Sequence, residues 1–359
     1  MPLRRETVEQ VLAQWIEPAL GADLVSAGAV RELVVTGERV ALELALGFPA
    51  GRYCETLAGA LERHLREATG EAVSLALEID WKVESATVQR GLEPFGGIRN
   101  IVAVASGKGG VGKSTTAANL ALALAQEGAA VGVLDADIYG PSQPRMLGLS
   151  GRPVSHDGKT MEPMEAHGVK CMSIGFLVDE EQPMVWRGPM VTQALTQLLN
   201  ETNWGELDYL VVDMPPGTGD TQLTLSQRVP LAGAVIVTTP QDIALLDARR
   251  GLQMFRKVNV NVLGLVENMS THVCSNCGHE EHIFGAGGGG KMAAQYGARL
   301  LGSLPLDIRI REETDSGTPT VVAEPDSVIA ASYRAIARAM AAELSRPGGA
   351  FPEIIEEDT

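Results

Sequence analysis

The sequence predicts an α/β protein with a mostly parallel sheet covered by helices on both faces, preceded by a small α+β domain. From residue 101 onward, short apolar runs alternate with segments of helical periodicity, which is typical of buried parallel strands joined by crossover helices. The region before it has the pattern helix, strand, strand, helix, strand. Residues 84–100, where Gly and Pro recur without period, are expected to link the two.

The small domain is expected to occupy residues 1–83. Two strand patterns flank the turn Thr36-Gly37-Glu38, and Leu57, Leu61 and Leu65 then recur at helical spacing. Cys54 lies on the side of that leucine stripe, which favours a small buried side chain over a metal ligand. The other predicted elements are a helix at 8–16 and strands at 30–35, 40–46 and 73–79.

The large domain is expected to span residues 101–346. Helices at 115–126 and 244–257 separate strands that are apolar enough to be buried on both faces. Residues 347–359 are rich in Gly and Pro and then in acidic residues, so we expect a disordered acidic tail. The strand candidates are 101–105, 131–134, 209–212, 234–238, 262–266 and 300–304.

A phosphate-binding loop follows the first of these strands. Residues 107–114 read Gly-Lys-Gly-Gly-Val-Gly-Lys-Ser, which matches G-x-x-x-x-G-K-[ST] in a strand–loop–helix setting and predicts a P-loop NTPase. Backbone N–H groups would cradle the phosphates, Lys113 would neutralise the β- and γ-phosphates, and Ser114 would bind Mg²⁺. ATP is favoured over GTP because the guanine-reading Asn/Thr-Lys-x-Asp pattern does not follow the later strands. The expected nucleotide-binding residues are Gly107, Lys108, Gly109, Gly110, Val111, Gly112, Lys113, Ser114 and Thr115.

Two aspartates follow apolar strands, at the edge where an open parallel sheet binds its ligands. Asp213 ends the strand at 209–212 and suits a carboxylate that supports Mg²⁺ beside a P-loop. Asp137 follows the strand at 131–134 and could orient the attacking water. Either aspartate taken alone would be interpreted as a helix cap or turn residue, so both assignments depend on the P-loop.

Lys108 is not required by an ordinary P-loop. A second cation at this position could act at the phosphates as an arginine finger does. The alternative is a solvated lysine that happens to lie on the loop.

Cys274 and Cys277 form a C-x₂-C pair in a polar, glycine-rich loop that we expect to extend to Gly290, with a helix from about Lys291. Two thiolates are half of a metal site, and a twofold dimer would supply the four that a [4Fe–4S] cluster needs. Four thiolates would equally hold Zn²⁺. From the residues alone, an iron–sulfur cluster and a zinc ion are about equally good candidates for the group that the cysteines bind.

A zinc site within one chain is a further alternative. His279 and His282 would complete a Cys₂His₂ set, although the single residue between Cys277 and His279 is a short gap for a zinc finger.

Amino-acid composition argues against some classes of binding partner and indicates a cellular compartment. The net charge of −16 argues against general nucleic-acid binding and against docking on anionic lipid. No window has the pattern of a signal peptide or of a membrane span. We therefore expect a cytoplasmic protein with reduced thiols that uses neither nucleic acid nor membrane as a partner.

The motifs resemble those of the deviant Walker A ATPases, which include the nitrogenase iron protein and the cell-division positioning ATPases. Within that group the chain is similar to the Mrp/ApbC-type iron–sulfur cluster carriers, from about Arg99 to Arg338. The small domain also resembles one linked to iron–sulfur assembly, although related domains often have a cysteine just after the second strand, whereas Cys54 is set into a helix. The matching stretches are 108–114, 135–142, 186–190, 207–220 and 274–285.

The resemblance implies a homodimeric ATPase that uses ATP and Mg²⁺ and delivers a bridging iron–sulfur cluster to apo-proteins. Lys108 would act across the dimer on the partner's phosphates, with Lys113, Asp137 and Asp213 as the other catalytic residues. Asn268 would contact adenine. The resemblance favours iron–sulfur over zinc at the cysteines. A positioning ATPase or a zinc-stapled ATPase without cluster transfer is the alternative.

Overall fold

The computed structural model describes residues 3–70, 72–89, 91–178 and 188–346. The predicted tail at 347–359 and the start of the 186–190 stretch lie outside the described residues.

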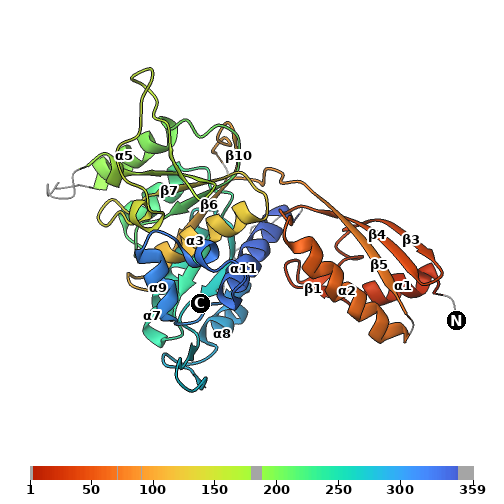
Figure 1. The fold of residues 1–359 in the computed structure, drawn as a ribbon. Helices are drawn as coiled ribbons and strands as arrows, with labels where there is room; N and C mark the ends of the chain where they lie inside the picture. Colours follow the sequence, from red (N-terminus) through yellow and green to blue (C-terminus); the bar gives the residue numbers. More distant parts are fainter. Residues whose placement is uncertain (1–2, 71, 90, 179–187, 347–359) are drawn as a thin grey trace, which may run out of the picture.

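An eight-stranded sheet forms the centre of the large part of the chain (Figure 1). Its order is β15-β12-β11-β6-β10-β7-β9-β8, and every neighbouring pair is parallel except β8 and β9. The central strands are almost wholly buried, as expected of parallel strands covered on both faces. The strands are β6 (Ile98–Ala105), β7 (Val131–Asp135), β8 (Met164–Ala166), β9 (Val169–Ser173), β10 (Leu207–Asp213), β11 (Gly233–Thr238), β12 (Val262–Glu267) and β15 (Leu300–Ser303).

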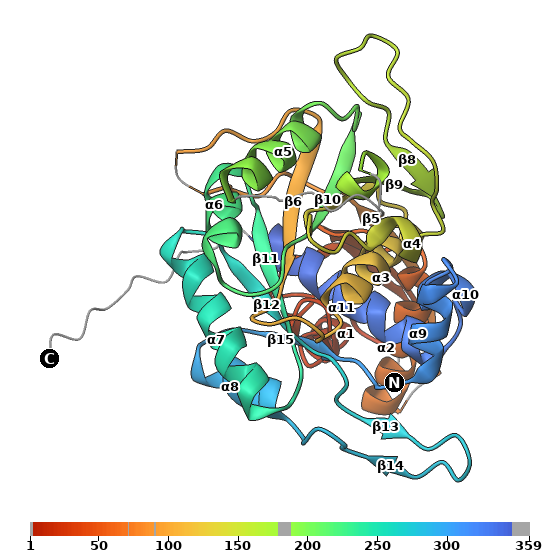
Figure 2. The same ribbon diagram turned by 90° about the vertical axis from the view of Figure 1, so that its left-hand side faces the viewer.

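Helices cover both faces of this sheet (Figure 2). One face carries α3 (Lys113–Gln126) and α11 (Val328–Ser345), which also pack on each other. The remaining helices are α4 (Gln143–Met146), α5 (Gly188–Asn200), α6 (Asp220–Arg228), α7 (Asp242–Lys257), α8 (Gly288–Gln295), α9 (Ile308–Asp315) and α10 (Thr320–Ala323), with a 3₁₀ turn at Ile174–Phe176. Among the described residues, no helix has the length and apolar character that crossing a bilayer requires. The predicted α/β fold class is confirmed.

The N-terminal part has its own three-stranded sheet, in which β3 pairs antiparallel with β4 and β4 pairs parallel with β5. The leucine stripe predicted around Leu57 is buried in α2, and Cys54 is partly buried near the start of that helix. The elements are α1 (Arg5–Leu12), β1 (Ile16–Glu17), β2 (Ala22–Asp23), β3 (Val30–Thr36), β4 (Arg39–Leu46), α2 (Tyr53–Thr69) and β5 (Ser74–Trp81).

Of the predicted boundaries that differ from the structure, two are set by tertiary contacts. The first helix ends at Leu12 rather than at residue 16, because Trp15 turns toward the His64 ring, 5.3 Å away, and Ile16 begins β1. The first strand of the large sheet begins at Ile98 rather than at residue 101, since Ile98 and Asn100 already pair with β10. The end of α1 and the start of β6 are both determined by contacts with distant residues, and the hydrophobic periodicity of the local sequence does not reveal such contacts.

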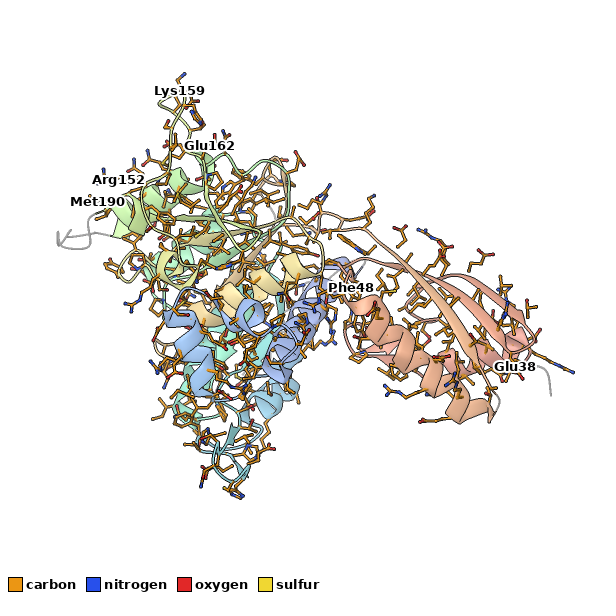
Figure 3. The ribbon with its side chains drawn as sticks, in the orientation of Figure 1. Glu38, Phe48, Arg152, Lys159, Glu162 and Met190 are labelled. Carbon is orange, nitrogen blue, oxygen red and sulfur yellow. The ribbon has the colours of Figure 1, made fainter. Side chains whose placement is uncertain are left out.

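The side chain of Glu127, directly after α3, connects the two parts of the chain. Its Oε2 accepts the N–H groups of Arg52 and Tyr53 at the start of α2, at 2.9 and 3.1 Å. Its Oε1 accepts from the Arg338 guanidinium at 2.6 Å, and that guanidinium lies 4.1 Å from the centre of the Tyr53 ring. Fully buried Phe48 lies at the same junction (Figure 3). Glu127 therefore caps a helix of the small part while pairing with a helix of the large part.

Replacing Glu127 with alanine is expected to lower the free energy of unfolding by about 3–5 kcal/mol, because Arg338 would keep a largely buried charge without its partner. Urea titration followed by circular dichroism measures this change. Glu62→Ala, which removes a more exposed pair with Arg66 on α2, should cost under about 1 kcal/mol. Equal losses in the two variants would contradict the connecting role of Glu127.

Candidate functional site

The P-loop joins the end of β6 to the start of α3, as the sequence predicts. Gly110 and Gly112 have φ of +82° and +81°, a region that favours glycine. A Cβ on Gly107 would collide with the backbone of Asp247 in α7, and a Cβ on Gly112 would collide with the Asn268 side chain. The loop is therefore confined from two sides: close packing requires glycine at Gly107, backbone conformation requires it at Gly110, and both require it at Gly112.

Lys113, Ser114 and Asp213 lie together at the start of α3. The Lys113 ammonium is buried, donates to Asp213 Oδ1 and lies 3.1 Å from Ser114 Oγ. Gln143 Nε2 donates to Asp213 Oδ2 at 2.9 Å and to the Ser114 carbonyl at 3.0 Å. Asp213 is fully buried, so a phosphate that attracts Lys113 must compete with this carboxylate.

Asp135, at the end of β7, organises the loop that carries Asp137. Its Oδ2 accepts the N–H groups of Ser142 and Gln143 at 2.9 and 3.0 Å and the Ser173 hydroxyl at 3.1 Å. Its Oδ1 accepts the N–H of Asp137 at 3.2 Å. Asp137 is the residue of the Asp-Ala-Asp motif predicted to act on the nucleotide, and no role was predicted for Asp135, although its position directly at the end of a strand is a usable signal.

The carboxyl groups here are desolvated. Burial, and then the neighbouring Asp213, raise the pKa of Asp135 to about 7. Burial also raises the pKa of Asp137, an effect that the positive charge of Lys113 opposes. The site therefore places three carboxyl groups and one ammonium where a nucleotide's phosphates and metal ion would lie.

Asp135 is expected to make the protein less stable as pH rises. A folded-state pKa above the unfolded value of about 3.9 means that the folded state holds a proton that the unfolded state has lost. The contribution is complete below about pH 4 and is lost as pH rises toward 7, with a slope of up to ~1.4 kcal/mol per pH unit. Urea midpoints between pH 5 and 8 should fall in the wild type and fall less steeply in Asp135→Asn. Asp315→Asn, which changes an exposed carboxylate, should keep the wild-type slope.

Lys108 is partly exposed on the loop, and its carbonyl accepts the Ser106 hydroxyl at 2.9 Å. Within the described parts of the chain, no carboxylate pairs with its ammonium group. Thr115 lies in the first turn of α3. The roles assigned to both residues remain predictions.

Asn268 follows β12 and contacts the P-loop directly. Its Nδ2 donates to the Val111 carbonyl at 2.8 Å, and its backbone N–H donates to Thr238 at 2.7 Å. The predicted adenine contact stays a prediction, whereas the bond to the P-loop is a second role that the sequence did not indicate.

The cysteine pair lies on a small hairpin formed by β13 (His272–Val273) and β14 (Glu280–Glu281) (Figure 2). The Cys274 N–H donates to the His279 carbonyl at 2.9 Å, and the Gly278 N–H donates back to the Cys274 carbonyl at 2.8 Å. The backbone amide of Asn276, and then that of Cys277, lower the pKa of Cys274 and favour its thiolate. Cys277 is exposed and Cys274 partly exposed, so both sulfurs are accessible for ligation.

The histidines near the pair do not complete a metal site. His282 Nδ1 lies 2.8 Å from the Ser270 carbonyl and His272 Nδ1 lies 3.0 Å from the Leu306 carbonyl. Among the residues that the structure places, no three His, Cys, Asp or Glu side chains converge as metal ligands. One chain therefore offers two thiolates, which are half of a tetrahedral donor set.

The hairpin is fixed to the sheet at its base. The Ser270 N–H donates to Leu304 at 2.9 Å, and the Leu306 N–H donates to Thr271 at 2.7 Å. The loop predicted to continue to Gly290 instead ends earlier, because α8 begins at Gly288 and the Gly289 N–H donates to the buried Glu267 carboxylate.

Comparison with known proteins identifies the family. A model described as "NUBPL iron-transfer P-loop NTPase" matches residues 97–341, and one described as "Iron-sulfur cluster assembly protein" matches residues 5–75. An iron–sulfur cluster carrier protein of Escherichia coli K12 is 52% identical over 353 residues, which cover 97% of this chain and 94% of the relative. The mouse iron–sulfur cluster transfer protein NUBPL is 56% identical over 255 residues, 70% of this chain and 80% of the relative.

Solved structures agree with the fold. A nucleotide-binding protein from Archaeoglobus fulgidus, in complex with ADP, is 38% identical with a TM-score of 0.56 and covers 64% of this chain and 90% of its own. The cell-division ATPase MinD of Pyrococcus furiosus is 22% identical with a TM-score of 0.50, covers 67% of this chain and 98% of its own, and supports the fold alone. With the P-loop and the cysteine hairpin in place, these matches show that the chain belongs to the NUBPL iron-transfer family of P-loop NTPases, among the iron–sulfur cluster carriers.

Proposed function

We propose that this chain hydrolyses ATP and carries an iron–sulfur cluster, held between two copies of the chain, to apo iron–sulfur proteins. The observation that carries the proposal is the short connection between its two sites. Asn268 donates to the P-loop, and Cys274 follows only a few residues later on a hairpin fixed to the same sheet edge. The carrier names of its relatives and the ADP bound by the archaeal protein support the cargo and the nucleotide.

The nucleotide chemistry follows from the residues of the site. Loop amides and Lys113 would bind the phosphates, and Asp137 would orient the attacking water. Ser114 would hold Mg²⁺ with support from Asp213; when bound, that ion neutralises charge on the phosphate oxygens. Movement of Lys113 toward phosphate would free Asp213 Oδ1, which Lys113 occupies here, for this supporting role.

The count of sulfur ligands supports a dimer. Cys274 and Cys277 supply two thiolates per chain, and a twofold axis between two hairpins would bring four to one place. The hairpin projects from the end of the sheet where the P-loop also lies (Figure 2), so a single dimer interface would include both sites. In that arrangement Lys108 would reach the phosphates bound by the partner.

Cluster transfer tests the proposal. The chain, reconstituted anaerobically, is mixed with an apo-enzyme whose activity needs a [4Fe–4S] cluster, in the presence of an iron chelator and with Mg-ATP, Mg-ADP or no nucleotide. We expect activation that free iron and sulfide cannot give under the chelator, at a rate that depends on ATP. A chain that loads a cluster yet activates no acceptor above the chelator control would contradict the carrier function. Zinc at the cysteines in place of iron would favour a zinc-stapled dimer.

A further inference from the structure

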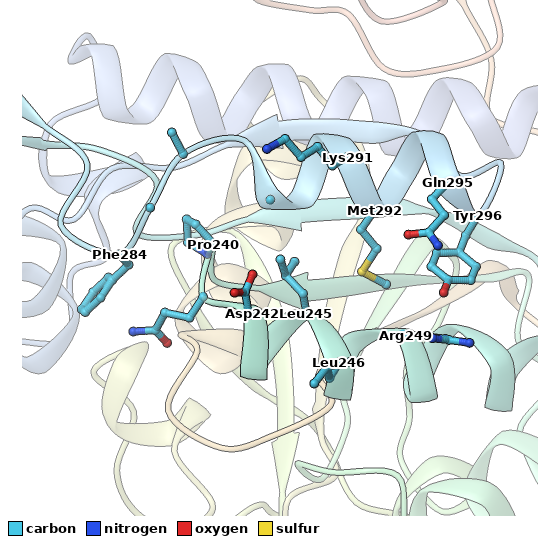
Figure 4. A pocket seen from close by; sticks show the side chains of 14 residues that line it. Pro240, Asp242, Leu245, Leu246, Arg249, Phe284, Lys291, Met292, Gln295 and Tyr296 are labelled. Carbon is cyan, nitrogen blue, oxygen red and sulfur yellow. The ribbon is translucent and has the colours of Figure 1, made fainter.

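A groove between α7 and α8 lies outside the nucleotide and thiol sites (Figure 4). Its cavity volume is about 580 Å³. Leu245 and Met292 lie toward each other across it. The lining includes Leu245, Leu246 and Arg249 from α7, Lys291 and Met292 from α8, and Tyr296 directly after α8.

The groove combines apolar surface with cations that lack counter-charges. Leu246 is 56% exposed, which leaves apolar surface in water. Arg249 lies 5.3 Å from the centre of the Tyr296 ring, and in the described parts of the chain neither Arg249 nor Lys291 pairs with a carboxylate. The acidic lining residue is Asp242, at the start of α7. Such a surface is complementary to a peptide that alternates apolar and acidic residues.

The chain contains a segment of that composition after its last helix. Residues 347–350 read Pro-Gly-Gly-Ala, and residues 351–358 read Phe-Pro-Glu-Ile-Ile-Glu-Glu-Asp. Three large apolar side chains are thus interleaved with four carboxylates, behind a spacer that imposes little conformational preference.

The segment leaves the structure next to one end of the groove. Glu343 in α11 accepts from Arg346 at 3.1 Å and from Arg299 at 2.6 Å, and Arg299 follows closely after Tyr296, which lines the groove. The four spacer residues can span roughly 13 Å when extended. The groove side of α8 from Tyr296 to Gly288 is about 12 Å long. Phe351 follows this spacer, and residues 352–358 are long enough when extended to run along the groove.

We infer that residues 351–358 bind in this groove of their own chain. Phe351, Ile354 and Ile355 would cover Leu245 and Leu246, and the carboxylates would lie beside Arg249 and Lys291. Because the backbone of α7 at Asp247 packs against Gly107, the bound segment would cover surface adjacent to the P-loop.

Photo-crosslinking from the full-length chain tests this inference. Benzoylphenylalanine in place of Phe351 is irradiated at low protein concentration, and the crosslinked peptides are identified by mass spectrometry. We expect crosslinks concentrated in 240–249 and 284–296. The double variant Arg249→Glu with Lys291→Glu should lose most of them, whereas Arg63→Glu with Lys159→Glu, at exposed sites elsewhere, should keep them.

Equal mixtures of ¹⁵N-labelled and unlabelled protein separate contacts within a chain from contacts between chains. Crosslinks within single chains only are expected. Crosslinks between labelled and unlabelled chains, crosslinks outside the groove, or indifference to the charge reversal at Arg249 and Lys291 would overturn the inference.

Discussion

Replacing both Cys274 and Cys277 with alanine is expected to abolish cluster binding and to leave the fold and nucleotide binding intact. The two thiolates of one chain are half of the ligands that a [4Fe–4S] cluster needs, so the double change removes all four from a dimer. Both side chains are at least partly exposed on a short hairpin, and their loss leaves no cavity in the core. Iron and sulfide analysis after anaerobic reconstitution, with absorbance spectra, measures the effect. The wild type should hold about four iron and four sulfide per dimer.

Two other cysteines provide the controls. Cys54→Ala changes a partly buried thiol in α2, and Cys171 is fully buried in β9, where burial raises its pKa and disfavours the thiolate. Both single alanine variants should keep the wild-type iron content. Iron that persists after loss of Cys274 and Cys277, or zinc in its place, would exclude the bridging cluster and leave the ATPase without this cargo.

The features that could be predicted from the sequence are those in which the local structure requires a particular type of residue. The P-loop needs glycine where φ is positive at Gly110 and Gly112, and buried parallel strands need apolar runs, so both could be recognised locally. The position of Asp213 at the end of a strand likewise placed it beside the P-loop.

The missed features depend on contacts between distant residues. β8 and β9 are short, and β9 is specified by its pairing with β7 rather than by its own length or period. Gln143 lies in the site because its N–H donates to the Asp135 carboxylate. Glu127 connects the two parts of the chain through Tyr53 and Arg338, which are 74 and 211 positions away in the sequence. No local pattern in the sequence encodes these partnerships.

Lys113 and Lys108 are expected to have different effects on ATP hydrolysis. Lys113→Gln keeps a donor for the buried Asp213 but removes the positive charge at the phosphates, and should lower kcat/KM by at least ~10³-fold. Lys108→Ala should leave Mg-ATP affinity within a few-fold and lower kcat by about 10³-fold, as loss of an arginine finger does. Equilibrium dialysis with labelled nucleotide and a steady-state phosphate assay separate affinity from turnover.

Mixing the two inactive variants decides whether Lys108 acts across the dimer. In a mixed dimer the Lys108→Ala subunit keeps an intact Lys113, and its Lys113→Gln partner keeps Lys108, so one complete site forms if Lys108 acts in trans. Random exchange makes half of the dimers mixed, each with one working site of two, and activity should return to roughly a quarter of wild type. If Lys108 served its own subunit, neither site of the mixed dimer would be complete and the mixture would stay inactive. Recovery would therefore establish both the dimer and the direction in which the lysine reaches.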